Sequence, residues 1–185
     1  MNLPGLGILK GMAVTARNLL GSYVSPDQMV TRQYPEEAAE LTESYRNFPF
    51  LVHDGGEADS GMRCVACKIC ERECPPQCIY IVSDRDAAGK LLKRPRIFDI
   101  DVSVCMSCQI CVEVCPFDAI RMDQVFELSD ADRFESLLLH KADLLKPDAY
   151  FHRMHPTEAA VVEERREAVR QKKAQGAEAG KEPTA

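Results

Sequence analysis

The chain has 185 residues and a formal net charge of −6 at pH 7, from 29 acidic residues against 23 Lys and Arg. This length suits one domain with extensions. Because no basic domain is present, the composition excludes nucleic acid as an expected partner, and no stretch reaches the roughly 20 apolar residues that a membrane-spanning helix needs.

Residues 3–21 are predicted to form an amphipathic helix, because their apolar side chains recur at steps of three and four. Pro4 suits the first turn of this helix and Gly21 suits its end. The segment is too short to cross a bilayer but is suited to lying on an apolar surface. We therefore expect it to dock on a partner or a membrane, the alternative being an ordinary helix packed on its own domain.

Residues 22–61 are predicted to be a connector that wraps over neighbouring chains. Three prolines argue against long helices within it: Pro26, Pro35 and Pro49. We expect a helix only over residues 35–45, extended pieces over 29–34 and 48–52, and a loop over 53–61.

Two runs of four cysteines share the spacing C-x2-C-x2-C-x3-C, each followed by proline. The runs are Cys64, Cys67, Cys70 and Cys74 before Pro75, and Cys105, Cys108, Cys111 and Cys115 before Pro116. In bacterial proteins with this spacing, three cysteines of a run bind one [4Fe–4S] cluster and the fourth binds the other. We therefore predict two clusters, the first held by Cys64, Cys67, Cys70 and Cys115 and the second by Cys105, Cys108, Cys111 and Cys74.

Two other interpretations of these cysteines are less favoured. Structural zinc sites usually combine two separate C-x2-C halves and do not need the third cysteine of each run. A disulfide framework is disfavoured because no secretory signal is visible, and intracellular cysteines in such patterns are more often metal ligands. A zinc-stabilised scaffold is thus the alternative of a different class.

The ninth cysteine, Cys78, lies outside this scheme. Aligning the two runs places it opposite Ala119, and both residue types are small and often buried. We interpret Cys78 as a packing residue, the other hypothesis being an alternative ligand or a redox-active thiol.

The two runs belong to an internal repeat, in which residues 63–82 overlay residues 104–123. Apolar burial alone stabilises so small a core poorly, so we expect the clusters to hold it together and the apo form to be largely unfolded. The predicted fold class is α+β, with a ferredoxin-like two-cluster core, an N-terminal amphipathic helix and a helical C-terminal extension.

Residues 83–103, between the runs, are predicted to complete a strand–turn–strand hairpin, with Gly89 in the turn. The hairpin is locally basic, which leaves two interpretations open: a solvated hairpin, or a contact with an acidic partner. Asp99 and Asp101, just before the second run, are interpreted as structural.

After the core, residues 126–145 are predicted to contain a helix with a capping box formed by Ser129 and Asp132. Its apolar face would consist of Phe134, Leu137, Leu138 and Leu139. Thr157 is expected to cap a charged helix that ends near Gln175, and the last ten residues, 176–185, are expected to be mobile.

No constellation of catalytic residues is recognised, and no glycine motif for a nucleotide. His152 and His155 are close enough in sequence to bind a metal, but we interpret them as part of a surface turn. The expected domain division is 1–61 for the docking segment, 62–126 for the two-cluster core, 127–156 for the helical extension and 157–185 for the charged tail.

The chain resembles subunit I of bacterial NADH:quinone oxidoreductase, respiratory complex I. The likeness rests on RCVACKICERECPPQCIYI, on FDIDVSVCMSCQICVEVCPFDAI and on the hairpin between them, and it extends over residues 5–146 through GILKGMAVTARNLL, VTRQYPEE and FELSDADRFESLLLHKADLL. The family usually has a basic Arg-Gly-x-His-like stretch before the first cysteine run. This chain has YRNFPFLV there, which keeps Arg46 but lacks the glycine and the basic residue. It also has Cys78 in place of the usual alanine, and a tail after residue 147 without a family pattern.

The resemblance implies an electron-transfer subunit of a membrane-associated, proton-translocating complex. Its two clusters would pass electrons toward the last cluster and the quinone site of a neighbouring subunit, and NADH would bind elsewhere. The implied partners are the Fe–S subunits of the peripheral arm, the quinone-site subunit and a membrane-arm subunit near the N-terminal helix. The implied location is peripheral, on the cytoplasmic side of the cell inner membrane.

Two related functions are the alternatives, namely the dicluster subunit of a membrane-bound hydrogenase and a stand-alone ferredoxin. The extensions on both sides of the core argue against a ferredoxin that diffuses freely.

Overall fold

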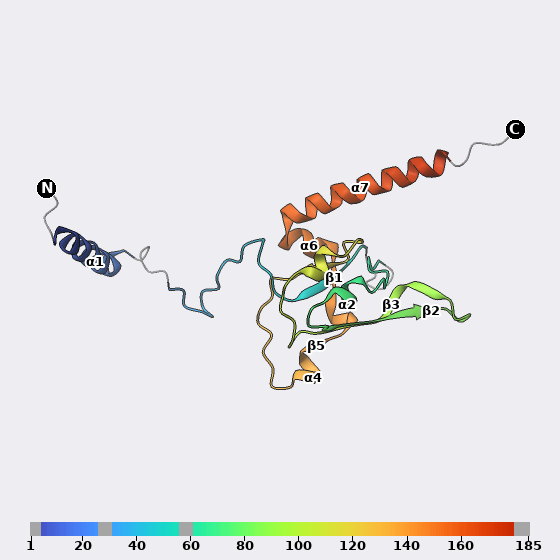
Figure 1. Ribbon diagram of the computed structural model, residues 1–185, viewed down its shortest axis with the longest axis horizontal. Helices are drawn as coiled ribbons and strands as arrows, with labels where there is room; N and C mark the ends of the chain where they lie inside the picture. The colour runs from blue at the N-terminus through green and yellow to red at the C-terminus, as the bar shows by residue number, and fades with distance from the viewer. Residues whose placement is uncertain (1–4, 26–30, 56–60, 180–185) are drawn as a thin grey trace. The chain divides into compact units, whose positions relative to one another are not determined.

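The computed structural model describes residues 5–25, 31–55 and 61–179. Figure 1 traces its helices and strands in chain order. The chain divides into two compact units, Met1–Glu40 and Leu41–Ala185. The division of the sequence into four domains stays a prediction.

The first unit contains helix α1 (Leu6–Val24), which confirms the predicted N-terminal helix. Gly21 does not end it, because the Gly21 carbonyl still accepts a hydrogen bond from the Ser25 N–H, one turn further on. Pro4 lies outside the described residues. The described part of the first unit buries no side chain of α1 and so leaves its apolar stripe uncovered.

The predicted helix over residues 35–45 is wrong. Residues 31–45 form turns and irregular structure instead, so the extended piece expected over 29–34 is also wrong where it is described; residues 29 and 30 lie outside the described part.

Contacts with the core explain why the end of this segment is not helical. The Glu43 carboxylate accepts hydrogen bonds from the N–H groups of Thr157 and Glu158, at 2.6 and 3.0 Å. The Asn47 N–H donates to the Asp123 carbonyl at 3.1 Å. Such tertiary contacts override a weak local preference for helix.

Strand β1 (Pro49–His53) is the middle strand of a three-stranded sheet, which confirms the extended piece predicted over 48–52. It pairs antiparallel with β4 (Ile120–Met122) and parallel with β6 (Leu145–Pro147). All of its residues are buried. The loop expected after it begins as predicted, and residues 56–60 lie outside the described part.

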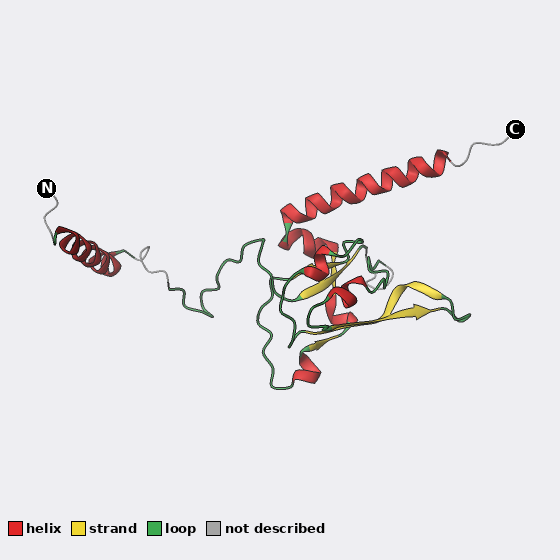
Figure 2. Cartoon of the chain, viewed as in Figure 1, coloured by secondary structure: helices red, strands yellow, loops and turns green. Residues whose placement is uncertain are grey.

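The second sheet has β3 (Leu91–Asp101) between β2 (Ile79–Arg85) and β5 (Leu138–Leu139). Strands β2 and β3 form the predicted hairpin, and Gly89 lies in its turn with φ 79°, which glycine adopts without steric cost. Figure 2 shows the turn end of the hairpin projecting away from the rest of the unit.

The core joins the two sheets, because it takes side chains from β1 to β4. Among them are Leu51, Ile81, Phe98 and Ile120, each at most 2% exposed. The predicted α+β class is confirmed.

The single helix predicted within residues 126–145 is wrong, since the segment forms α4 (Arg133–Ser136), β5, α5 (Lys141–Leu144) and β6. Strand β5 pairs with β3 and β6 pairs with β1. Backbone groups along β3 and β1 need hydrogen-bond partners, and this pairing outweighs the helix preference of a Leu-rich segment.

The helix cap also differs from the prediction. Asp132, and not Ser129, is the N-cap of α4, and its carboxylate accepts a hydrogen bond from the Phe134 N–H at 2.8 Å. Phe134 itself is 74% exposed, so it does not form part of a buried face.

Helices α6 (Asp148–Met154) and α7 (Pro156–Ala179) form the C-terminal extension. Thr157 lies inside the first turn of α7, so it is not the cap. The helix also continues past Gln175, so residues 176–179 are helical and not the predicted mobile tail. Residues 180–185 lie outside the described part.

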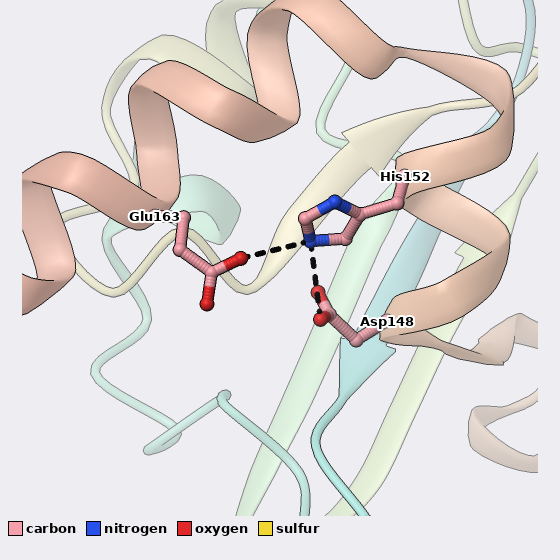
Figure 3. A group of neighbouring side chains, drawn as sticks. All are labelled: Asp148, His152 and Glu163. Carbon is pink, nitrogen blue, oxygen red and sulfur yellow. Dashed lines mark ion pairs between the residues drawn. The ribbon is translucent and has the colours of Figure 1, made fainter.

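Apolar and charged contacts both fasten α7 to the unit. Ala159 and Val162 pack with buried residues of β1 and α6. His152 of α6 lies 3.3 Å from the Asp148 carboxylate and 3.2 Å from that of Glu163 (Figure 3).

The Asp148–His152–Glu163 group has the side chains of a metal site. However, the guanidinium of buried Arg63 contacts the other oxygen of Asp148. This neighbouring positive charge disfavours a cation, so we interpret the group as an ion-pair network between the helices.

His155 contradicts the predicted surface turn. It is only 4% exposed, and its Nε2 lies 2.8 Å from the carbonyl oxygen of Met122 in β4.

Asp54, after β1, makes a second ionic contact with α7. Arg63 Nε lies 2.8 Å from its carboxylate, and Arg166 of α7 binds both carboxylate oxygens. Partial burial would raise the pKa of Asp54, but hydrogen bonds from Arg166 and Arg63 lower it from 3.8 to about 2. The ionised carboxylate therefore stabilises the fold above about pH 4, and this contribution is lost as the pH falls toward 2.

The substitution Asp54→Asn should loosen α7, because it removes the ionic contact with Arg166. The carboxylate is partly exposed, so we expect the docking of α7 to lose about 1 kcal/mol of free energy. The fraction of molecules in which α7 is undocked should then rise roughly fivefold. Trypsin cleavage within α7 measures this change. The ratio of variant to wild type should stay constant from about pH 5 to 9, since wild-type Asp54 is ionised throughout that range.

Glu164→Gln is the matched control, because it removes an exposed charge from the same helix and should leave cleavage unchanged. Equal cleavage of Asp54→Asn and wild type would mean that apolar contacts alone hold α7.

Candidate metal centres

Both cysteine runs fold into loops with the same unusual backbone. Within the described residues, positive φ occurs at six positions other than glycine, and they form three pairs at matching positions of the repeat: Ala66 with Ser107, Lys68 with Gln109, and Gln77 with Asp118. A left-handed residue turns the chain sharply, and successive N–H groups in such loops line a concave surface that suits anions. The loops are therefore built to surround a negatively charged group.

A short helix follows in each loop, namely α2 (Ile69–Glu73) and α3 (Ile110–Glu113). Each begins at one of the left-handed residues. Cys74 then ends α2 in an extended conformation, with φ −70° and ψ 117°, as the residue before a proline prefers. The Cys-Pro pair thus directs the fourth cysteine away from its own loop.

The eight cysteines of the runs line two small cavities. Cys64, Cys67, Cys70 and Cys115 line one of them, hereafter the first cavity. Cys74, Cys105, Cys108 and Cys111 line the other, hereafter the second cavity. In each cavity, the fourth cysteine of one run lies with the first three of the other.

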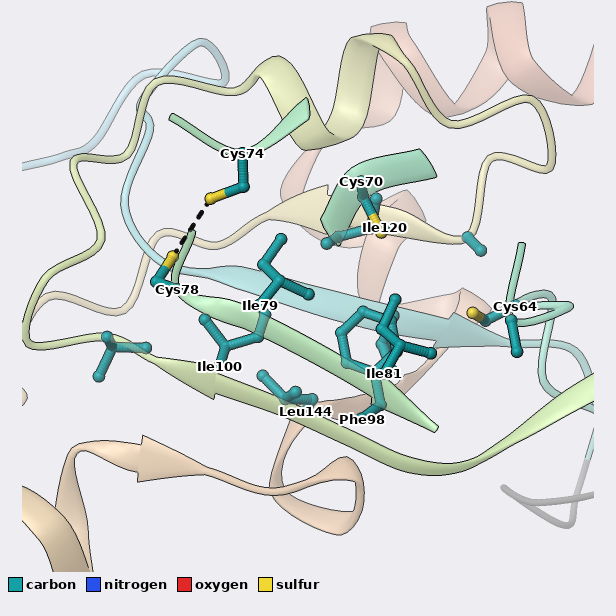
Figure 4. Packing of buried hydrophobic residues seen from close by; sticks show 14 residues of the cluster. Cys64, Cys70, Cys74, Cys78, Ile79, Ile81, Phe98, Ile100, Ile120 and Leu144 are labelled. Atoms are coloured by element: carbon teal, nitrogen blue, oxygen red, sulfur yellow. Dashed lines mark hydrogen bonds between the residues drawn. The ribbon is translucent and has the colours of Figure 1, made fainter. Parts of the chain in front are cut away.

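Figure 4 shows how the core separates these sites. Cys74 lies near one end of the cluster of buried side chains and Cys64 near the other, with Ile79 and Phe98 between them. Ile81, Phe98 and Ile120 line the first cavity. Such apolar walls exclude water and influence the potential of a bound cluster.

Burial keeps three of these thiols protonated. Burial, together with a smaller effect of neighbouring cysteines, raises the pKa of Cys64 to about 11 and the pKa of Cys70 and Cys111 to about 12. A thiolate, and not a thiol, binds metal, so metal binding must displace these protons. The positive charge of iron compensates the buried thiolates. Sulfur donors in two apolar cavities thus fit two iron–sulfur clusters.

Neither cysteine cavity is lined by a histidine, so His152 and His155 are not brought to these sites. Asp99 lies 2.8 Å from His140, and Asp101 lies 2.7 Å from Arg133. Both aspartates thus link the hairpin to the segment that follows the core.

A buried ionic group follows the second run and was not predicted from the sequence. Arg121 is 4% exposed, and its guanidinium lies 2.6 Å from Asp118 and 2.7 Å from Glu158 of α7. Opposite charges three residues apart were the only available signal, and Glu158 is too distant in sequence to be connected with them.

These loops and cavities define a two-cluster iron–sulfur protein of the ferredoxin type. The family of the 4Fe-4S dicluster domain matches residues 63–119. The chain is 36% identical over 155 residues to NADH-quinone oxidoreductase subunit I 2 of Streptomyces coelicolor, over 78% of this chain and 69% of that protein. It is 30% identical over 139 residues to the protein of the same name from Geobacter metallireducens, over 75% of this chain and 96% of that protein.

The chain belongs to the NADH-quinone oxidoreductase subunit I family. The resemblance, the ferredoxin-like class of the fold and the presence of two [4Fe–4S] clusters as cofactors are thereby confirmed.

Among solved structures, a chain of the membrane-bound sulfane sulfur reductase, an archaeal respiratory membrane complex, is similar with a TM-score of 0.46. It is 22% identical and the match covers 70% of this chain and 62% of that chain. A likeness this distant carries no functional argument.

The left-handed residues should tolerate glycine better than a β-branched residue. Gln109 has φ 69°, so we expect Gln109→Val to destabilise the protein by about 1–2 kcal/mol. Gln109→Gly should stay close to wild type, because glycine adopts this φ freely. The thermal midpoint and the iron content measure both effects.

Glu113→Val is the control, since Glu113 is exposed and lies in right-handed α3. If valine were tolerated equally well at positions 109 and 113, the left-handed backbone would not be needed for the loop.

Proposed function

We propose that this chain is an electron-carrying subunit of a membrane-associated, proton-translocating NADH–quinone oxidoreductase. One observation carries the proposal: two cavities, each lined by three cysteines of one run and the fourth of the other, share a single core in a member of the subunit I family. Two clusters on one small core lie close together, and this suits the passage of electrons between them.

We assign the ligands according to the cavities. Cys64, Cys67, Cys70 and Cys115 hold the first cluster, and Cys105, Cys108, Cys111 and Cys74 hold the second. Each cluster, when bound, takes up and passes on one electron at a time. The chain itself fixes the thiolates in place, surrounds them with backbone N–H groups and keeps water away with apolar side chains.

The chain is proposed to convert no substrate of its own. Three of its histidines already have polar partners within the described residues: His140 with Asp99, His152 with Asp148 and Glu163, and His155 with a backbone carbonyl. Neither cysteine cavity is lined by a histidine, so no base stands beside the eight cysteines within these cavities.

Its partners are proposed to be the neighbouring Fe–S subunits, the quinone-site subunit and a membrane-arm subunit, at the cytoplasmic face of the cell inner membrane. The support comes from α1, where Ile8, Leu9, Met12 and Leu20 are between 63% and 71% exposed. Apolar surface of this kind marks a contact with a protein or a membrane. Among the described helices, none has the length and apolar character needed to span a bilayer.

Purification of the native assembly through a tag on this chain tests the proposal. We expect flavin-, NADH- and quinone-site subunits to copurify, with at least eight iron and eight sulfide per copy of this chain, because its two [4Fe–4S] clusters require eight of each and the neighbouring Fe–S subunits add their own. Zinc in place of iron, isolation of the chain alone, or a copurifying nickel–iron hydrogenase would each contradict it.

The substitution Cys74→Ala tests the crosswise assignment. Cys74 belongs to the first run but lines the second cavity, so its loss should damage the centre that Cys108→Ala damages and spare the one that Cys67→Ala damages. EPR spectra of the reduced complex, together with iron content, distinguish the two centres. Damage to the same centre as in Cys67→Ala would overturn the assignment.

A further inference from the structure

The second cavity contains a fifth cysteine. Cys78, just before β2, is 8% exposed and lines the same cavity as the four proposed ligands. Its Sγ lies 3.5 Å from Cys74 Sγ, the contact drawn as a dashed line in Figure 4. Four sulfurs already complete the ligand set of one cluster, so Cys78 has no place among the ligands.

Packing does not account for this sulfur. The matching position in the first cavity is Ala119, which is 3% exposed and fills its place with a methyl group. The backbone around Cys78 is fixed, because its carbonyl accepts a hydrogen bond from the Asp101 N–H at 2.9 Å. The two cavities, related by the internal repeat, thus differ here by one thiol.

The contact with Cys74 sets the direction of the hydrogen bond. Cys78 Sγ lies 3.5 Å from Cys74 Sγ, and as a metal ligand Cys74 would be a thiolate, which has no proton to donate. Cys78 is therefore the donor and Cys74 the acceptor in the occupied site.

The direction of its effect on the cluster follows from charge. A hydrogen bond to a ligand sulfur withdraws negative charge from it, and this stabilises the more negative, reduced state. Pro75, Pro76 and Ile79 form the adjacent wall of the cavity. With apolar groups in place of water, such a hydrogen bond is electrostatically stronger than in solution.

We propose that Cys78 is a positioning residue that raises the reduction potential of the second cluster, by donating an S–H hydrogen bond to the ligand sulfur of Cys74. The proposal rests on the ligand assignment made above. Electron uptake at this cluster involves no proton transfer from Cys78, whose S–H bond stays intact in both redox states. The repeat thus produces two similar clusters whose potentials differ through this residue.

Redox titration of both EPR signals in the purified complex tests the proposal, with Cys78→Ala and Cys78→Ser compared with wild type. In Cys78→Ala, we expect the ratio of reduced to oxidised second cluster at a fixed potential to fall about tenfold, which is about 59 mV for one electron. The first cluster should not shift. Cys78→Ser should keep most of the wild-type potential, because the hydroxyl remains a donor.

Ala119→Cys is the reciprocal variant, since it introduces a thiol at the matching position of the first cavity. It should raise the potential of the first cluster only. A further readout is a proton whose magnetic coupling to the second cluster disappears on exchange into D2O. This exchangeable coupling should be present in wild type and absent in Cys78→Ala.

An unchanged potential of the second cluster in Cys78→Ala would show that Cys78 only packs. Loss of iron from that site would show that it is a ligand. Either result overturns the proposal for Cys78, provided that the wild-type complex shows the EPR signals of both clusters. If the wild-type complex lacked two [4Fe–4S] signals, the proposed function would fail instead.

Discussion

Both cavities depend on one constraint, because the fourth cysteine of each run leaves its own loop and lines the cavity of the other run. Cys74 is the extended residue that ends α2, and it lines the second cavity. Cys115 lines the first cavity. Neither site is complete without both halves of the repeat. The shared core of Ile81, Phe98 and Ile120 joins those halves. Folding and cluster binding are therefore coupled across the whole unit, and not separately within each loop.

This coupling explains how the loops tolerate an unfavourable backbone. Each non-glycine residue in the left-handed region costs about 1 kcal/mol or more, and the two loops contain six of them. Burial of Cys64, Cys70 and Cys111 as thiols also opposes their ionisation. A core this small gains little from apolar burial to offset these costs. Iron–thiolate bonds offset them, so the loops are stable as part of a metal centre.

The features that were predicted well from the sequence are those that depend on residues close together in the chain. The cysteine spacing predicts the metal, Gly89 predicts the hairpin turn, and the apolar run before His53 predicts a strand. The segment over 126–145 was mistaken because Leu138–Leu139 and Leu145–Pro147 pair with strands distant in the chain. The burial of His155 has the same cause, since its partner is a carbonyl of β4. Long-range pairing leaves no periodic trace in the sequence, and so these features could not be read from it.

Helices α1 and α7 show how differently two terminal helices obtain their stability. In α7, Ala159 and Val162 are buried against the core, and Arg166 pairs with Asp54. The helix is otherwise strongly charged, and these few contacts suffice to dock it. In α1, the apolar stripe is broader, and the described part of its own unit buries none of it. A lone helix is only marginally stable in water, because helices in proteins gain most of their stability from packing an apolar face. The apolar stripe of α1 therefore needs a packing partner outside the described part of its own unit.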